Sequence, residues 1–168
     1  MDFPTTISGG CLCGAIRYSI SASDQTPWPP ISSTCQCTMC RKWTSSLVAQ
    51  FLVVSTGCLQ PELREYETYE EYESSPRRFR GFCRRCGTSL VWRSGDDGRT
   101  VDVFLGTLDE QWLVHHGDGR LGETLSKPNG TQFWMENAIL GVTDLLKGGM
   151  EYPQEGPDGR FEGDEGHP

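Results

Sequence analysis

Three clusters of cysteine are the residues of this chain whose type and spacing most clearly predict chemistry. Two of the clusters are pairs: Cys11 and Cys13 form a CxC pair, and Cys83 and Cys86 form a CxxC pair that Gly87 follows. Thiolate sulfur is a preferred ligand of Zn²⁺, and a CxxC turn ending in glycine lets two sulfurs converge on one ion. Because a structural zinc site needs four ligands, we predict that the two pairs together hold one zinc ion in a closed site that contributes folding energy.

The third cluster is a CxCxxC triplet formed by Cys35, Cys37 and Cys40. No fourth cysteine is near it in sequence, and three protein ligands with one exchangeable position are typical of a catalytic or ligand-binding zinc. Three thiolates around Zn²⁺ leave a net negative charge, and Arg41 and Lys42 follow the triplet directly. We therefore expect the triplet to hold a zinc ion with an open position, and Arg41 and Lys42 to offset its charge and position a substrate.

Several other interpretations of these residues stay open at the level of sequence. Cys58 could join the triplet and close a second structural zinc site, and the pairs could instead form redox disulfides or hold an iron–sulfur cluster. His115 and His116 are a further source of a fourth ligand. Arg41 and Lys42 could equally be solvated surface charges. Only the positions of these side chains in the fold can separate the alternatives.

Composition limits the classes of protein to which the chain can belong. It has 168 residues, a formal net charge of -8 and 36% hydrophobic residues, which fits one ordinary domain. The net negative charge argues against binding to nucleic acid, and no apolar run approaches the roughly 20 residues that span a bilayer. Eight cysteines without a visible secretory signal favour a reducing compartment, so we expect a cytoplasmic protein.

Period-two alternation of apolar residues predicts short strands separated by turns, and hence a mainly β domain of short antiparallel strands. In the first strand Ile16, Tyr18 and Ile20 share one face. The expected strands cover residues 15–21, 46–54, 89–92 and 101–105.

Helical patterns are scarce, and the end of the chain is poor in core-forming residues. We expect one helical turn at residues 38–42 and a helical stretch within 134–146, whereas 62–73 fits either a strand pair or an exposed segment. Residues 1–147 are then the zinc-binding domain, and the acidic, Gly- and Pro-rich residues 148–168 are a mobile tail.

Taken in order, these motifs resemble one known family. The segments are GGCLCGAIRY from Gly9, CQCTMCRK from Cys35, and RGFCRRCGT from Arg80, the last preceded by Ser74 and Ser75. They are similar to the glutathione-dependent formaldehyde-activating enzyme (GFA) family, which also includes centromere protein V and has the Mss4-like zinc-binding β fold.

The resemblance implies roles for the cysteines and an activity. It implies two zinc ions per chain: a structural ion on the two pairs and an active-site ion on the triplet. The implied reaction joins formaldehyde to the small-molecule thiol glutathione, giving S-hydroxymethylglutathione, and classes the enzyme as a carbon–sulfur lyase. Gln36 stands where the family often has histidine, and residues 134–138 stand where many members have a different run, which leaves the substrate open.

The leading hypothesis is thus a zinc-dependent carbon–sulfur lyase-type enzyme that acts on a thiol or thiol adduct. Two alternatives accompany it. The first is a non-catalytic zinc module that binds a thiol ligand or a protein partner, and the second is a specialised enzyme that uses the same zinc on a bulkier small molecule.

Overall fold

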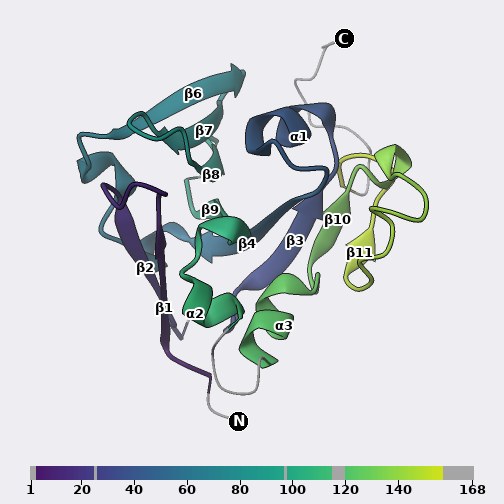
Figure 1. Ribbon diagram of the computed structural model, residues 1–168, viewed down its shortest axis with the longest axis horizontal. Helices are drawn as coiled ribbons and strands as arrows, with labels where there is room; N and C mark the ends of the chain where they lie inside the picture. The colour runs from purple at the N-terminus through teal and green to yellow at the C-terminus, as the bar shows by residue number, and fades with distance from the viewer. Residues whose placement is uncertain (1–2, 25, 97, 115–119, 157–168) are drawn as a thin grey trace.

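The fold is built on two β-sheets, and the computed structural model describes residues 3–24, 26–96, 98–114 and 120–156. The larger sheet has eight strands in the order β11-β10-β3-β4-β9-β8-β7-β6 (Figure 1). From β3 to β6 every neighbouring pair is antiparallel, whereas β10 is parallel to both β3 and β11. The bounds of these strands are β3 Ile31–Cys35, β4 Ala49–Ser55, β6 Tyr69–Ser75, β7 Arg78–Cys83, β8 Ser89–Ser94, β9 Thr100–Phe104, β10 Thr131–Phe133 and β11 Met150–Glu151.

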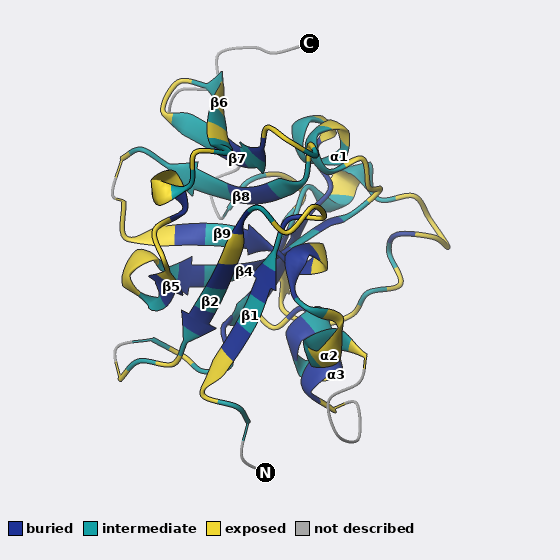
Figure 2. Ribbon diagram, turned by 60° about the vertical axis from the view of Figure 1, so that its left-hand side comes forward, coloured by how far each residue is buried: buried dark blue, intermediate teal, exposed yellow. Residues whose placement is uncertain are grey.

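The smaller sheet covers one face of the larger one. Its order is β1-β2-β5, with β1 at Thr6–Gly10, β2 at Arg17–Ser21 and β5 at Leu59–Gln60. In Figure 2 strands β1 and β2 cross in front of β4 and β9, and the buried residues lie where the two sheets meet. Burial of these apolar side chains is the main stabilising term of such a sandwich.

Helices are few and short among the described residues. The α-helices are α1 at Thr38–Thr44, α2 at Glu110–Leu113 and α3 at Arg120–Ser126. Single 3₁₀ turns lie at Thr56–Cys58, Leu63–Glu65, Leu105–Thr107 and Met135–Asn137. The prediction of a mainly β fold is therefore confirmed, and no helix in the described part of the chain is long and apolar enough to cross a membrane.

The alternation of side chains along the central strands gives the larger sheet two different faces. Leu52 of β4 and Val103 of β9 are fully buried in the core beneath the smaller sheet. Their neighbours Phe51, Asp102 and Phe104 point to the opposite face, where they line a cavity. One face of the sheet thus stabilises the fold, and the other carries the candidate site.

Most of the predicted strands are confirmed, with shifted ends. Ile16, Tyr18 and Ile20 are at most 3% exposed, as expected for the buried face of the first strand. The strand expected at 46–54 begins three residues later as β4, and the undecided segment 62–73 becomes a 3₁₀ turn followed by β6. The helical turn expected at 38–42 is α1.

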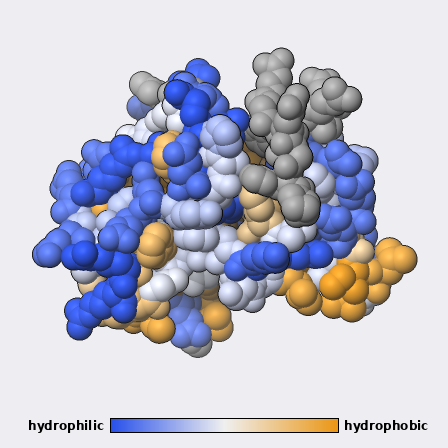
Figure 3. Space-filling view, turned by 90° about the horizontal axis from the view of Figure 1, so that it is seen from above, coloured by the Kyte–Doolittle hydropathy of each residue, from blue (hydrophilic) through white to orange (hydrophobic). Residues whose placement is uncertain are grey.

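The helix expected within residues 134–146 is wrong, because only the 3₁₀ turn Met135–Asn137 forms there. Several apolar side chains of this region are exposed instead: Leu140 at 86%, Leu145 at 66% and Val142 at 56%. This region lies on the right of Figure 1, and Figure 3 shows apolar side chains gathered at the lower right of its view. The apolar spacing that suggested a helix therefore does not reflect a buried face.

Residues 148–156, the described part of the expected mobile tail 148–168, add a strand to the sheet, and residues 157–168 lie outside the described residues. Met150 and Glu151 form β11 beside β10, and Tyr152 stacks on Phe133 with ring centroids 6.4 Å apart. Backbone N–H groups of residues 134–136 donate to carbonyls of residues 152–154. A strand can be added to a sheet edge with few apolar residues, because backbone hydrogen bonds stabilise the pairing.

Candidate metal centres and cavity

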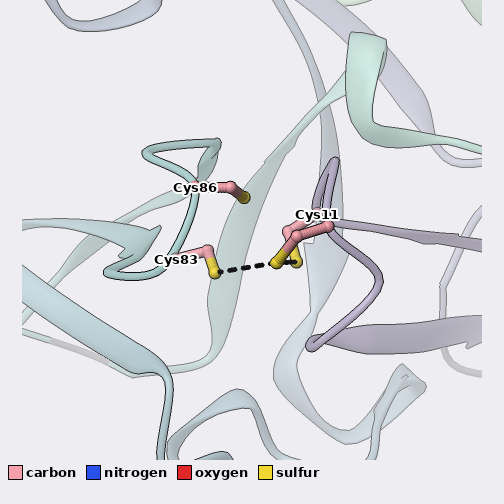
Figure 4. A group of neighbouring side chains, drawn as sticks. Cys11, Cys83 and Cys86 are labelled. Carbon is pink, nitrogen blue, oxygen red and sulfur yellow. Dashed lines mark hydrogen bonds between the residues drawn. The ribbon is translucent and has the colours of Figure 1, made fainter.

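The two cysteine pairs meet although they lie about 70 residues apart in the chain. The sulfurs of Cys11, Cys13, Cys83 and Cys86 all lie within 4.8 Å of one another. Cys11 Sγ is 3.5 Å from Cys13 Sγ, which is 3.9 Å from Cys83 Sγ. Figure 4 shows the labelled sulfurs of Cys11, Cys83 and Cys86 pointing toward a common centre from two separate turns.

These distances fit a tetrahedral metal site and not a disulfide. Sulfurs on a tetrahedron with Zn–S bonds of ~2.3 Å are about 3.8 Å apart, whereas a disulfide needs about 2.05 Å. All eight cysteines are free thiols. The redox-disulfide alternative is therefore not the arrangement that the structure shows.

Glycine completes both turns that carry the cysteine pairs. Gly14 has φ 73° and Gly87 has φ 76°, a conformation that side-chain-bearing residues rarely adopt. The amide of Gly14 donates to the Cys11 carbonyl, and that of Gly87 donates to the Cys83 carbonyl. The backbone N–H of Ile16 donates to Cys11 Sγ at 3.3 Å, which helps to stabilise a thiolate there. These are the features that an S₄ metal site requires of its turns.

The triplet is brought together by the end of a strand and the start of a helix. Cys35 is the last residue of β3, Cys37 is the N-cap of α1, and Cys40 lies one turn into α1. Their sulfurs lie within 4.8 Å of one another. Among the described residues no fourth Cys, His, Asp or Glu joins the group.

Donors around the triplet favour negative charge on sulfur. The thiols of Cys35 and Cys40 donate to Cys37, as does the backbone N–H of Cys40 at 3.3 Å, and together they lower the pKa of Cys37 to about 3. The hydrogen bonds that the Cys35 thiol makes to Cys37 and to Cys40 hold the pKa of Cys35 well above its ordinary value. One thiolate thus forms readily, as expected for three sulfurs arranged to bind one cation.

A cavity of about 270 Å³ opens beside the triplet. All three cysteines line it, together with apolar side chains that include Phe51, Phe104 and Phe133. Its charged lining comes from Arg77, Arg78, Arg80, Asp96, Asp102 and Glu155. The triplet therefore lines a cavity, whereas the pair site lies at the surface of the protein, where Cys13 is exposed.

Arg80 is the cation that approaches the triplet. It is only 3% exposed, its Nη1 donates to Cys40 Sγ at 3.6 Å, and its Nε donates to Ser74 Oγ at 2.9 Å. Its charge helps to lower the pKa of Cys37, after the hydrogen bonds from the other two thiols. A buried guanidinium beside thiolates offsets the negative charge of an all-cysteine site.

The expectation that Arg41 and Lys42 position a substrate is not what the structure favours. The guanidinium of Arg41 donates to Gln36 Oε1 and to the carbonyls of Leu47 and Asn137. Neither Arg41 nor Lys42 lines the cavity. Arg41 is instead held by the loops that surround α1, because a guanidinium with carbonyl partners at 2.7 to 2.9 Å is already satisfied.

Of the remaining candidates for a fourth ligand of the triplet, the structure decides the case of Cys58. Cys58 packs against the core between the two sheets, with its sulfur 4.0 Å from Thr26 Oγ1, and does not join the triplet. The second closed site that Cys58 would complete is therefore contradicted. His115 and His116 lie outside the described residues.

Two groups near the triplet escaped the sequence analysis. Asp102 and Glu155 line the cavity from β9 and from the segment after β11. The alternation of residues 101–105 places Asp102 opposite Val101 and Val103, and that was the available signal. Nothing local marks Glu155, because its position depends on the pairing of β11 with β10.

The fold and the two sulfur clusters define a β-sheet protein with two candidate metal centres, one closed and one facing a cavity. The model of the family described as "Glutathione-dependent formaldehyde-activating enzyme" matches residues 6–133. This match covers most of the chain, and the protein therefore belongs to that family.

Two individual proteins are similar to the chain. An uncharacterized lyase of Schizosaccharomyces pombe is 37% identical over 100 residues, which are 58% of this chain and 66% of the relative, just under two thirds of its length. A crystal structure of a Rhodobacter sphaeroides protein superposes with a TM-score of 0.48 at 18% identity, covering 61% of this chain and 88% of the other.

Proposed function

We propose that the protein is a zinc-dependent lyase-type enzyme that makes and breaks the carbon–sulfur bond between a small thiol and formaldehyde, with glutathione as the thiol. The observation that carries the proposal is the cysteine triplet, which forms part of the wall of a cavity. Membership of the family and the name of the yeast relative support the reaction class.

The two cysteine sets are chemically suited to zinc. Four sulfurs in a closed group and three beside an open cavity correspond to the structural and catalytic forms of zinc sites. Zinc held by Cys35, Cys37 and Cys40 would supply a Lewis acid that lowers the pKa of a thiol reaching its open position. The four sulfurs of the pairs would hold the second ion without contact to substrate.

The charges along the cavity fit an anionic thiol. Side-chain exposure falls from 63% at Arg77 to 17% at Arg78, and Arg80 beside the triplet is only 3% exposed. Arg77 and Arg78 share Asp96 as an ion-pair partner, so they present positive charge at the outer part of the cavity. We propose that they attract the carboxylates of glutathione while its sulfur lies at the inner end.

The inner end of the cavity, beside the triplet, also has an apolar lining that affects electrostatic interactions there. Phe51, Phe104 and Phe133 give the space beside the triplet an apolar wall, and Arg80 supplies charge there. Charge–charge interactions are stronger in such a site than in water. The eight free thiols also fit the reducing conditions of the cytoplasm, which we include in the proposal.

The test compares the wild-type protein with Cys37→Ser and with the control Cys58→Ser, which alters a cysteine outside both sets. We expect about two zinc ions per chain in the wild type and the control, and one in Cys37→Ser. Exchange of formaldehyde between water and glutathione, followed by NMR, should be faster with the wild type and fall to the uncatalysed rate with Cys37→Ser.

Two results would contradict the proposal. A wild-type protein that binds two zinc ions but leaves the exchange rate unchanged would support a non-catalytic thiol-binding module. Full activity of Cys37→Ser would remove the triplet from the mechanism.

A further inference from the structure

Asp102 stands out because strand geometry points a carboxyl group into the cavity from the middle of the sheet. It lies on β9 between Trp92 of β8 and Val53 of β4, its direct cross-strand partners. Trp92 in turn pairs with Arg80 of β7. A single row across the sheet therefore places Asp102 and Arg80 on the same face, separated by one tryptophan.

The carboxyl group of Asp102 has no charged or hydrogen-bonding partner among the described residues. Asp96, in the same cavity, pairs with Arg77 and Arg78, and Asp109 pairs with Arg17. An unpaired carboxyl in apolar surroundings favours its neutral form. Burial accordingly raises the pKa of Asp102 to about 8.

The other charged groups that face the cavity do not cancel the rise in the pKa of Asp102. Arg80 already donates to Ser74 and to Cys40, and Arg77 and Arg78 pair with Asp96. Glu155 and the sulfurs of the triplet line the same cavity, and burial is the cause of the raised pKa of Asp102. A carboxyl that can hold or release a proton near neutral pH is suited to acid–base catalysis.

We infer that Asp102 is the catalytic acid and base of the carbon–sulfur reaction. This inference rests on the proposed function, because it assigns a role within the same site. The aldehyde oxygen would lie on the side of the cavity that β9 forms, opposite the sulfurs of the triplet.

Asp102 alone then accepts and returns the one proton that the reaction transfers. When a thiol enters the cavity, its proton moves to the Asp102 carboxylate and leaves a thiolate. The thiolate sulfur attacks the formaldehyde carbon, the C–S bond forms, and the carbonyl π electrons move to oxygen. That oxygen takes the proton back from Asp102, giving the S-hydroxymethyl product and the original carboxylate.

The reverse reaction uses the same group in the opposite order. The Asp102 carboxylate removes the hydroxyl proton, the C=O bond reforms, and the C–S bond breaks with its electrons returning to sulfur. The departing thiolate is then protonated by Asp102. No oxidant or additional reactant is needed in either direction.

The test compares Asp102→Asn with the control Asp24→Asn, which makes the same chemical change at an exposed position outside the cavity. Asparagine keeps the size of the side chain and removes its acid. We expect Asp102→Asn to bind two zinc ions and to lower the enzyme-dependent rate about 100-fold, a typical contribution of general acid–base catalysis. Asp24→Asn should retain the wild-type rate.

The pH profile separates an acid–base role from a structural one. In the wild type, addition begins when the Asp102 carboxylate accepts the thiol proton, so its rate should rise as pH rises through about 8. Breakdown of the adduct also begins with the carboxylate and should rise over the same range. Both rises should disappear in Asp102→Asn.

An independent readout does not require activity. Infrared difference spectra of the zinc-loaded protein between pH 6 and pH 9, a range of about one to two units around the titration, should contain a carboxylic-acid band. This band should be lost in Asp102→Asn and kept in Asp24→Asn.

The outcomes distinguish this inference from the function on which it rests. If the wild type does not accelerate thiol–formaldehyde exchange, both proposals are overturned. If the wild type is active and Asp102→Asn keeps its rate and pH profile, or if the carboxylic-acid band persists in that variant, the role of Asp102 alone is overturned.

Discussion

At the scale of single residues, the character of the open site depends on which cation approaches the sulfurs. The chain places Arg41 next to Cys40 in sequence, but the fold places Arg80 next to it in space. A charge acts through distance, not through sequence separation. The buried Arg80, and not Arg41 or Lys42, is therefore the cation that contacts a sulfur of the triplet.

Replacing Arg80 by methionine should weaken the hold of the triplet on its metal. The loss of a buried positive charge raises the pKa of the thiols, so protons compete with zinc at higher pH. In a pH titration with a chromophoric chelator, release of one of the two ions should shift upward by about one pH unit.

Arg64→Met is the matched control, because Arg64 is half exposed and pairs with Glu71 away from the cavity. It should release zinc as the wild type does. Identical release curves for Arg80→Met and the wild type would show that Arg80 does not act on the sulfurs.

At the scale of elements, the closed site is made by two turns whose backbone conformation only glycine adopts at low cost. A Cβ added to Gly87 would meet no atom within 4 Å, so the cost of a substitution there comes from its φ of 76° alone. Gly57 also has open space around its Cβ position, but its φ lies outside the positive range.

This contrast predicts opposite results for two alanine substitutions. Gly87→Ala should lower the free energy of unfolding of the zinc-loaded protein by about 1 kcal/mol, since alanine is strained in the left-handed region. Gly57→Ala should leave it unchanged or raise it by up to about 1 kcal/mol, because alanine reduces the entropy of the unfolded chain. Urea denaturation measures both, and equal effects of the two changes would contradict the backbone argument.

At the scale of the whole molecule, the closed site joins the two sheets. Cys11 and Cys13 follow β1 of the smaller sheet, whereas Cys83 ends β7 of the larger one. The binding free energy of a structural zinc is about 10–16 kcal/mol, which is as large as the total stability of an ordinary domain. The metal is thus expected to decide whether the two sheets stay together.

Replacing Cys83 by serine should therefore prevent folding. We expect loss of the cooperative thermal transition by circular dichroism and loss of bound zinc by elemental analysis. Cys58→Ser, at a cysteine that belongs to neither set, should keep both. A folded Cys83→Ser protein with one zinc ion would show that the core holds the sheets together without this site.

The sequence by itself determined the local chemistry of this protein. Cysteine spacing, the glycines after the pairs and the period-two strands are encoded by residues close to one another, so the mainly β fold and the triplet could be predicted. The two distant pairs could be joined because a structural zinc site needs four ligands. The tertiary structure alone decided which distant residues meet at the open site. Arg80 and Asp102 share its cavity because β7, β8 and β9 are in register, and β11 brings Glu155 there. Register and strand order depend on long-range pairing, which the short apolar patterns of a single strand do not specify.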